Sequence, residues 1–339
     1  MYRNLSNHLH FLHKNGKIEA QITRKDFQNM KFLQFLEGIR TPFGNTLMSA
    51  ITLLGEEILF IVLALVFFWC IDKKRGYYLL FSCFAGTVCI QFLKMIFRIP
   101  RPWVSYPNFT IVDSAREAAT GYSFPSGHTQ CAAGLFGGIA CSAKKRAVQI
   151  GCVVIVLLVG FSRMYLGVHT PLDVFVSLGI AILILFTLYH VVYRGFDKPK
   201  QIYLASGVLL AVTVANLLFV MLYRFPIDVP VDQINHAQES AWQMLALAIG
   251  LCIIYPIDRY WIRFETKAVW WAQILKLIIG VGLVLVVRYL LKSPINSLFG
   301  ANIGKFVRYF LIVAVAGILW PMTFKFWSKL GQKKEDAAE

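Results

Sequence analysis

Three short stretches of the chain contain the side chains that phosphate chemistry needs. They supply three cationic residues, two histidines, one aspartate and a serine-glycine pair. The stretches are Lys94 with Arg101-Pro102, then Pro125-Ser126-Gly127-His128, and finally Ser162-Arg163 with His169 and Asp173. Phosphoryl transfer depends on positioning the phosphate and on neutralising its negative charge, and fixed cations achieve both. These residue types therefore indicate a phosphoryl-transfer site that needs no metal ion.

The first stretch places Lys94 and Arg101 seven residues apart. This spacing is close to two helical turns, so a helix that continues to Arg101 would carry both cations on one face. Pro100 and Pro102 would then end the helix. The alternative is a lysine and a flanking arginine whose charged ends reach the membrane surface without a catalytic role.

The second stretch precedes an apolar segment. Ser126 can cap the helix that begins there, and the amides of the first helical turn, including that of Gly127, favour an anion. An imidazole beside a bound phosphate is a natural general acid near neutral pH, which is the role that His128 suits. The alternative is an ordinary serine cap followed by a histidine at the membrane interface.

The third stretch ends in a helix-start pattern, Thr170-Pro171-Leu172-Asp173. Thr at the N-cap, Pro at the first position and an acid at the third predict a capping box, which alone would explain Asp173. Asp173 also lies four residues after His169, where a carboxylate can fix the tautomer of the imidazole and raise its nucleophilicity. The two roles are compatible.

The chain that must position these residues is strongly apolar. Of its 339 residues, 57% are hydrophobic and 15% are charged. Apolar runs of about 17–25 residues between charged or turn-forming flanks are typical of membrane spans. We therefore expect an all-α, polytopic transmembrane helical bundle with nine spans, of which the first has Glu56 and Glu57 at its edge. The expected spans lie near 55–71, 77–97, 127–142, 147–167, 172–193, 202–223, 241–257, 268–291 and 305–326.

The net charge of +16 is concentrated in alternate loops, which therefore share one face of the membrane. The positive-inside rule makes that face cytoplasmic. The basic loops are 72–75, 144–146, 194–200, 259–267 and 325–334, and the loops 98–125, 224–240 and 292–304 lie on the opposite face. Basic loops also bind anionic lipid headgroups, so we expect membrane lipids and no nucleic acid as partners. Lys94, Arg101 and Arg163 fall at the opposite face, which predicts a site on the non-cytoplasmic side. We expect an integral protein of the cell (inner) membrane, although an endoplasmic-reticulum membrane would give the same charge pattern.

The apolar and polar segments predict four regions along the chain. The run from Asn45 to Leu54 is too short to span a membrane, and nothing before it resembles a signal peptide. The regions are a polar N-terminal segment (1–44), a catalytic transmembrane core (45–200), additional transmembrane helices (201–327) and a polar tail (328–339).

Neither a metal ion nor a cofactor is expected. His8, His10 and His13 lie close together in the polar N-terminal segment. Closely spaced histidines in such a segment are more often incidental than ligands of a metal ion.

The three stretches together resemble the signature of the type 2 phosphatidic acid phosphatase superfamily. The matching patterns are Lys94-x6-Arg101-Pro102, Pro125-Ser126-Gly127-His128 and Ser162-Arg163-x5-His169-x3-Asp173. That superfamily includes lipid phosphate phosphatases, undecaprenyl pyrophosphate phosphatases, glucose-6-phosphatases and vanadium haloperoxidases. The resemblance covers residues 45–195 and does not extend to the four apolar spans after Lys200.

The resemblance implies a role for each residue of the signature. His169 would be the nucleophile that forms a phosphohistidine, held by Asp173, and His128 would protonate the leaving oxygen and then activate water. The phosphate would be bound by Lys94, Arg101, Arg163, Ser126 and the Gly127 amide, with Ser162 in support.

Three functions share these residues. A phosphatase acting on a lipid phosphate or pyrophosphate fits a site at the membrane surface, and the apolar spans argue against a haloperoxidase, because members of that group are mostly soluble. A non-catalytic lipid-binding or transport protein is the other alternative, because intramembrane polar residues are often functional. The residues concerned are Asn216, Lys276, Arg288 and Arg308, of which Lys276 and Arg288 could also reach the membrane surface. Two histidines and an aspartate favour catalysis, since binding alone needs no acid and no nucleophile.

Overall fold

The chain is helical throughout the part that the structure describes. The computed structural model describes residues 30–117, 119–227 and 229–330, and no β-strand occurs in these ranges. The expectation of an all-α bundle is confirmed. His8, His10 and His13 lie outside the described residues.

Seven of the described helices are long and apolar enough to cross a membrane. They are α5 (Lys73–Phe97), α9 (Arg146–Tyr165), α10 (Pro171–Leu188), α11 (Pro199–Leu222), α12 (Val231–Ile257), α13 (Trp270–Tyr289) and α14 (Lys292–Ala314). An eighth span results if α3 (Pro42–Thr52) and α4 (Glu57–Val66) are taken together, since the helical segments Pro42–Gly55 and Glu57–Ile71 meet at a bend of 50°. These helices make the chain an integral membrane protein.

The structure offers seven or eight long apolar spans in place of the expected nine, and the segment 127–142 is not among them. It forms α7 (Gly127–Ala132) and α8 (Gly138–Ser142), joined by a helical turn over 133–137, and is shorter than the helices counted as spans. Its small residues pack closely against α5: a Cβ placed on Gly134 would lie 2.5 Å from Cys83 Sγ. Apolar composition here reflects burial among other helices and not contact with lipid.

If the bent pair is one span, that span begins earlier than expected. The run Asn45 to Leu54 is too short alone, but it belongs to α3 and continues through the bend into α4. Likewise, much of the predicted loops 224–240 and 292–304 is helical, because α12 begins at Val231 and α14 at Lys292. α14 has a kink at Gly300, whose φ of 76° lies in the left-handed region that favours glycine.

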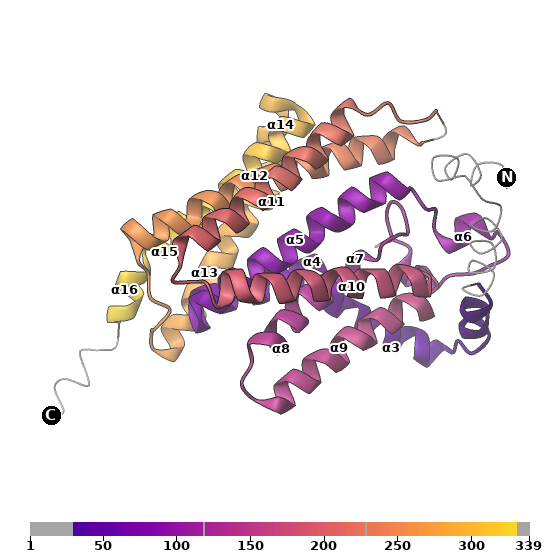
Figure 1. Cartoon of the computed structure of the whole chain (residues 1–339), viewed down its shortest axis with the longest axis horizontal. Coiled ribbons are helices and arrows are strands. Elements are labelled where there is room, and N and C mark those ends of the chain that lie inside the picture. Colours follow the sequence, from indigo (N-terminus) through magenta and orange to yellow (C-terminus); the bar gives the residue numbers. More distant parts are fainter. Residues whose placement is uncertain (1–29, 118, 228, 331–339) are drawn as a thin grey trace.

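Helix α5 lies between two groups of helices (Figure 1). It contacts α7 and α10 on one side and α11 and α12 on the other, while α12 also packs along α14. The helices after residue 200 therefore form a layer beside the N-terminal group, and α5 packs against both. A single hydrophobic cluster crosses this boundary, with Phe81 of α5 and Tyr255 of α12 among its buried members.

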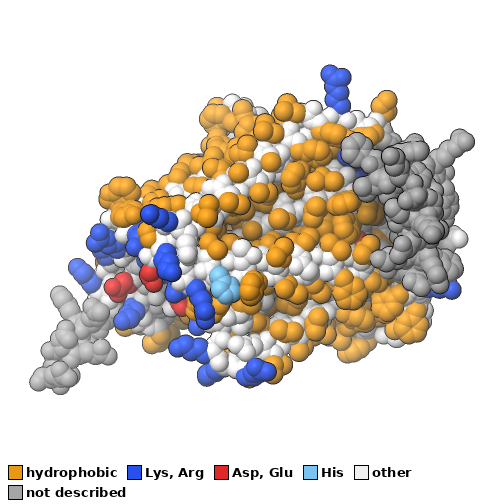
Figure 2. All heavy atoms as spheres, in the orientation of Figure 1, with side chains coloured by type: hydrophobic (Ala, Val, Ile, Leu, Met, Phe, Trp, Pro, Cys, Tyr) orange, Lys and Arg blue, Asp and Glu red, His pale blue; other side chains and the backbone are white. Residues whose placement is uncertain are grey.

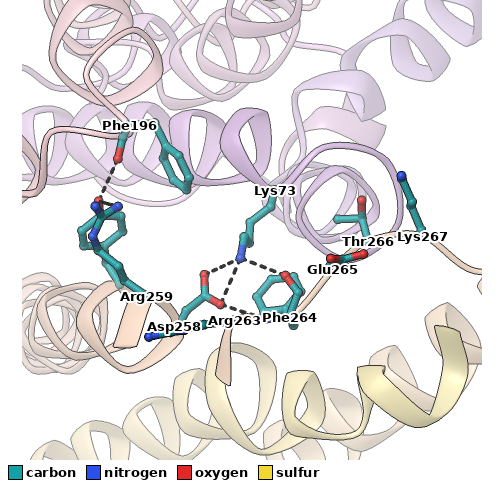
Figure 3. Close-up of a pocket in the computed structure, with 10 residues that line it drawn as sticks. Lys73, Phe196, Asp258, Arg259, Arg263, Phe264, Glu265, Thr266 and Lys267 are labelled. Carbon is teal, nitrogen blue, oxygen red and sulfur yellow. Dashed lines mark hydrogen bonds and ion pairs between the residues drawn. The ribbon is translucent and has the colours of Figure 1, made fainter. Parts of the chain in front are cut away.

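A partly buried ion pair joins the two groups at the beginning of α5 (Figure 3). Lys73 Nζ lies 3.0 Å from Asp258 Oδ2 and donates a hydrogen bond of 2.9 Å to the Phe264 carbonyl oxygen. The Tyr77 hydroxyl donates to the same carboxylate at 3.3 Å. These contacts lie beside a cavity of about 510 Å³ at the opposite end of α5 from Lys94.

The outer surface of the helices is strongly apolar. Figure 2 shows a broad hydrophobic band, with the basic side chains gathered mainly at one end of the molecule. Side chains on α10 and α11 are typical of this band: Ile182, Leu183, Phe186 and Leu204 are each about two-thirds exposed. Large aliphatic side chains at such exposure are suited to lipid and not to water.

A helix over residues 30–38 covers part of the other end, within the segment expected to be polar and N-terminal. Its residues Met30, Leu33 and Leu36 are buried against Phe109 and Met164. Phe109 is therefore part of this small core.

Lys276 is enclosed by protein groups and is not exposed on the outer surface of the helices. It is fully buried, donates a 3.2 Å hydrogen bond to the Thr266 carbonyl oxygen and lies 4.4 Å from the centre of the Phe324 ring. Lys276 thus holds the loop that precedes α13 against the helix through this hydrogen bond.

Candidate active site

His169 is held by a carboxylate at the beginning of α10. Thr170 caps this helix and forms the predicted capping box with Asp173, which places the aspartate beside the imidazole. Asp173 Oδ2 lies 3.3 Å from His169 Nδ1 and accepts a 2.6 Å hydrogen bond from the Ser123 hydroxyl. Both roles expected of Asp173, cap and histidine partner, are therefore present in one side chain. Ser123 is a part of this arrangement that the sequence did not suggest.

Arg101 faces the other nitrogen of the same imidazole. Its Nη1 lies 2.9 Å from His169 Nε2, and the guanidinium also donates to the carbonyl oxygens of Gly121, Thr120 and Val168. Because Arg101 can only donate, the lone pair of His169 is on Nε2 and the proton is on Nδ1, toward Asp173. Nε2 is thus the nitrogen available as a nucleophile.

The expectation that Lys94 and Arg101 share a helical face is wrong. α5 ends at Phe97, Arg98 has the left-handed φ of 49° that closes the helix, and Arg101 is the N-cap of the separate helix α6 (Pro102–Ser105). Lys94 nevertheless lies near enough to Arg101 and Asp173 to interact with them electrostatically. The turn after α5, and not helical periodicity, brings the two cations to one site.

Arg163 is completely buried near the end of α9 and has unused hydrogen-bonding capacity. Its Nη1 donates a 2.8 Å hydrogen bond to Thr52 Oγ1 at the end of α3. Its Nε and Nη2 are buried without a hydrogen-bond partner in the described part of the chain. A buried guanidinium with unsatisfied donors is costly unless an anion binds to it. Neighbouring Ser162 turns away, since its hydroxyl donates to the Val159 carbonyl oxygen at 2.7 Å.

Ser126 and Gly127 begin α7 in the predicted way. Ser126 is the N-cap, and its hydroxyl oxygen accepts from the Thr129 amide. Its own amide donates to the Asp173 carbonyl oxygen at 3.1 Å, which links the second stretch of the signature to the third. The amides of Gly127 and His128 have no acceptor within the helix because they belong to its first turn. A Cβ on Gly127 would meet no heavy atom within 4 Å, so the backbone faces open space there.

His128 contacts Glu56, a residue that the sequence analysis did not connect with the site. Its Nε2 lies 2.9 Å from Oε1 of Glu56, at the bend between α3 and α4. In the sequence, Glu56 is notable only as a charge at the edge of an apolar span. Nothing in its spacing from the signature stretches indicates this contact, because 72 residues separate the partners.

The electrostatic surroundings keep His169 neutral. Burial lowers the pKa of His169 well below its ordinary value, and the nearby cations Arg101 and Arg163 lower it further. A neutral imidazole has a lone pair with which to attack phosphorus, whereas an imidazolium does not. The same cations would stabilise the charge of a bound phosphate.

These positions determine what chemistry the site can perform. It combines a nucleophilic nitrogen, a second histidine with its own carboxylate, buried cations and helix-start amides. Within the described ranges, no group of three or more His, Cys, Asp or Glu residues is arranged to hold a metal ion.

Two parts of the chain match family models. Residues 75–197 match the PAP2 superfamily, and residues 242–333 match a model described as the PAP2 superfamily phosphatase, transmembrane extension. The second match covers much of the region in which the sequence signature had suggested no likeness.

Individual proteins are similar to the signature-bearing part of the chain. Undecaprenyl-diphosphatase BcrC of Bacillus subtilis (strain 168) is 34% identical over 107 residues, which cover 32% of this chain and 52% of that protein. Phosphatidylglycerophosphatase B of the same organism is 32% identical over 150 residues, which cover 40% of this chain and 69% of that protein. The chain thus spans about half the length of the first relative and about two thirds of the second. The crystal structure of Aquifex aeolicus LpxE superimposes with a TM-score of 0.43 at 24% identity, covering 48% of this chain and 95% of that one.

Proposed function

Because this chain belongs to the PAP2 superfamily, we propose that it is an integral membrane phosphatase that hydrolyses the terminal phosphate of a lipid phosphate or lipid diphosphate. The observation that carries this proposal is the environment of His169. Its imidazole is buried, with Nδ1 directed to Asp173 and Nε2 directed to Arg101. A non-catalytic binding site would not need a neutral, oriented nucleophile.

In the first chemical step, Nε2 of His169 attacks phosphorus and the bond between phosphorus and the lipid oxygen breaks. His128 gives its proton to that oxygen, so the lipid leaves as an alcohol, or as a monophosphate if the substrate is a diphosphate. In the second step, water attacks phosphorus, His128 takes a proton from the water, and the P–N bond breaks. Inorganic phosphate and neutral His169 result.

Cationic side chains stabilise the phosphate in this scheme. Arg163 supplies its two unpartnered nitrogens, Arg101 turns from His169 Nε2 toward the phosphate, and Lys94 adds a third positive charge. Ser126 and the Gly127 amide bind from the start of α7. The reaction then requires neither a metal ion nor a cofactor, because these groups do what Mg²⁺ does in kinases.

A lipid substrate is supported by the membrane setting and by the relatives. The names of both Bacillus subtilis relatives denote phosphatases of lipids, one of undecaprenyl diphosphate and one of phosphatidylglycerophosphate. The signature residues lie at the end of the bundle opposite the basic loops, so the phosphate would be released on the non-cytoplasmic side.

The core 45–200 carries the chemistry, and the helices 201–327 are its membrane extension.

The test uses purified full-length protein in detergent micelles with a panel of phosphatidate, phosphatidylglycerophosphate, sphingoid phosphate and polyprenyl diphosphate. Phosphate release should persist in EDTA and be inhibited by vanadate, which mimics the transition state. His169→Ala should abolish release, whereas His190→Ala should not, because His190 is an exposed histidine just beyond the other end of α10. Rapid-quench labelling should find acid-labile phosphate on His169.

Three results would contradict the proposal. Absence of release from every lipid would refute the enzymatic function. Loss of activity in EDTA that Mg²⁺ restores would refute the metal-free mechanism. Phosphate on His128 in place of His169 would reverse the roles of the two histidines.

A further inference from the structure

Glu56 makes a direct contact with the second histidine of the site. The two side chains are partly shielded from solvent, with exposed fractions of 37% for Glu56 and 15% for His128. Their 2.9 Å contact uses Nε2 of the imidazole. The other ring nitrogen, Nδ1, has no hydrogen-bond partner among the described residues. One nitrogen is therefore occupied by a carboxylate and the other remains available.

The local backbone is shaped for this contact. Glu56 is the N-cap of α4, at the 50° bend that follows Gly55. A Cβ on Gly55 would lie 2.8 Å from the His128 carbonyl oxygen and 2.9 Å from Val159 Cγ1. Only glycine permits so close an approach of the bend to α7, and this approach brings the next residue, Glu56, to the imidazole.

The charges around His128 give this carboxylate a specific effect. The charged groups that face the imidazole are Glu56 at the bend, Lys94 on α5 and Arg163 on α9. Burial, together with the two cations, lowers the pKa of His128 below its ordinary value, and Glu56 is the one of these three charged groups that opposes this effect and favours the imidazolium. A general acid must carry its proton before the leaving group departs.

We propose that Glu56 is the positioning residue of the acid-base histidine, an inference that rests on the proposed phosphatase function. Glu56 accepts the Nε2–H of His128 and thereby directs Nδ1 to the reaction. When the P–O bond breaks, the proton on Nδ1 passes to the lipid oxygen and His128 becomes neutral. When water attacks, Nδ1 takes the proton back. Each histidine of the site then has its own carboxylate, Asp173 for the nucleophile and Glu56 for the acid.

The inference is tested by comparing two leaving groups. An alkyl phosphate such as phosphatidate needs protonation of its leaving oxygen, whereas an acyl-chain-bearing aryl phosphate releases a stable phenolate without it. In Glu56→Gln, kcat/KM for phosphatidate should fall about 10–100-fold, as for other residues that orient a functional side chain, and kcat/KM for the aryl phosphate should change little. The ratio of the two values does not depend on how much of the variant is folded.

The pH profile gives a second measurement. Without the carboxylate, the imidazolium is less stable, so the alkaline limb of kcat/KM for phosphatidate should move to lower pH in Glu56→Gln. Glu56→Asp should restore part of the activity. The matched control is Glu57→Gln, which removes the adjacent carboxylate at the same bend and should behave as the wild type. In a His128→Ala background, Glu56→Gln should cause no further loss.

The outcomes separate the inference from the proposed function. Equal losses on both substrates, or no loss on phosphatidate, would overturn the inference and leave an active phosphatase. A further large loss in the His128→Ala background would also overturn it, because Glu56 would then act without His128. A wild type that hydrolyses neither substrate nor any lipid phosphate would overturn the proposed function and the inference together.

Discussion

Replacing Arg163 by methionine should make the protein more stable and nearly inactive. In the free protein, Nε and Nη2 of Arg163 are buried without a hydrogen-bond partner among the described residues. A buried unsatisfied donor costs about 1–3 kcal/mol, so the two nitrogens cost roughly 2–6 kcal/mol of unfolding free energy. Arg163→Met also loses the hydrogen bond from Nη1 to Thr52, which is worth about 1 kcal/mol. The variant should therefore be more stable by about 1–5 kcal/mol.

The same substitution removes a side chain that we propose donates to the phosphate. The loss of one such donor typically lowers kcat by about 10²–10³-fold. Thermal unfolding in detergent, with and without vanadate, measures both parts of the argument. Vanadate should raise the melting temperature of the wild type strongly and that of Arg163→Met only weakly, because the variant lacks the donors that the anion would satisfy.

Arg308→Met is the matched control. Arg308 is also a buried arginine in a membrane helix, α14, with Nε and Nη1 lacking partners among the described residues, but it lies outside the group of residues around His169. Its replacement should raise stability without loss of phosphate release or of the vanadate effect. If Arg163→Met were less stable than the wild type and still fully stabilised by vanadate, the idea that Arg163 awaits an anion would be refuted.

Three further predictions concern the pH dependence of stability, the ion pair between the two helix groups and the orientation of the protein in the membrane. The pKa of His169 is lowered in the folded protein, so below its ordinary pKa of about 6.5 the unfolded chain binds a proton that the folded chain does not. Stability should consequently fall as pH decreases below that value, and His169→Gln should weaken this dependence in unfolding experiments between about pH 4 and 8. Lys73→Met should lower the unfolding free energy because it leaves the buried Asp258 carboxylate unpaired, and Asp258→Leu should lower it less because Lys73 is 23% exposed. The double variant should lose less than Lys73→Met, and additive losses would argue against the ion pair. Single cysteines at the exposed positions Asn108 and Lys145, in a background lacking the native cysteines, test the orientation. The cysteine at 108 should react with an impermeant thiol probe in intact cells, and the cysteine at 145 should react only after permeabilisation. The reverse pattern would place the site on the cytoplasmic face of the membrane.

The second family match changes how the C-terminal helices are understood. The sequence offered their buried polar residues as possible sites of binding or transport. In the structure, Lys276 fastens a loop and α12 packs along α11 and α14 as a layer beside α5. The match of residues 242–333 to a phosphatase transmembrane extension agrees with a region that belongs to the catalytic protein.

The sequence alone determined the features that depend on local chemistry. Runs of apolar residues identify membrane helices because a bilayer requires a continuous apolar length. The Ser126 cap and the Thr170–Asp173 capping box were predictable because each involves residues three positions apart, and the structure has both. The spacing of four residues likewise anticipated the contact of His169 with Asp173.

Tertiary structure decided the contacts between distant segments. Arg163 meets Thr52 across 111 residues and His128 meets Glu56 across 72, and no periodicity in the sequence encodes either distance. The left-handed turn at Arg98 could not be predicted from the sequence either. The packing of the next segment, as well as local propensity, determines which residue ends a helix. Residue types thus specify which reaction the chain is equipped for, whereas helix packing specifies which nitrogen of each histidine is held and by which carboxylate.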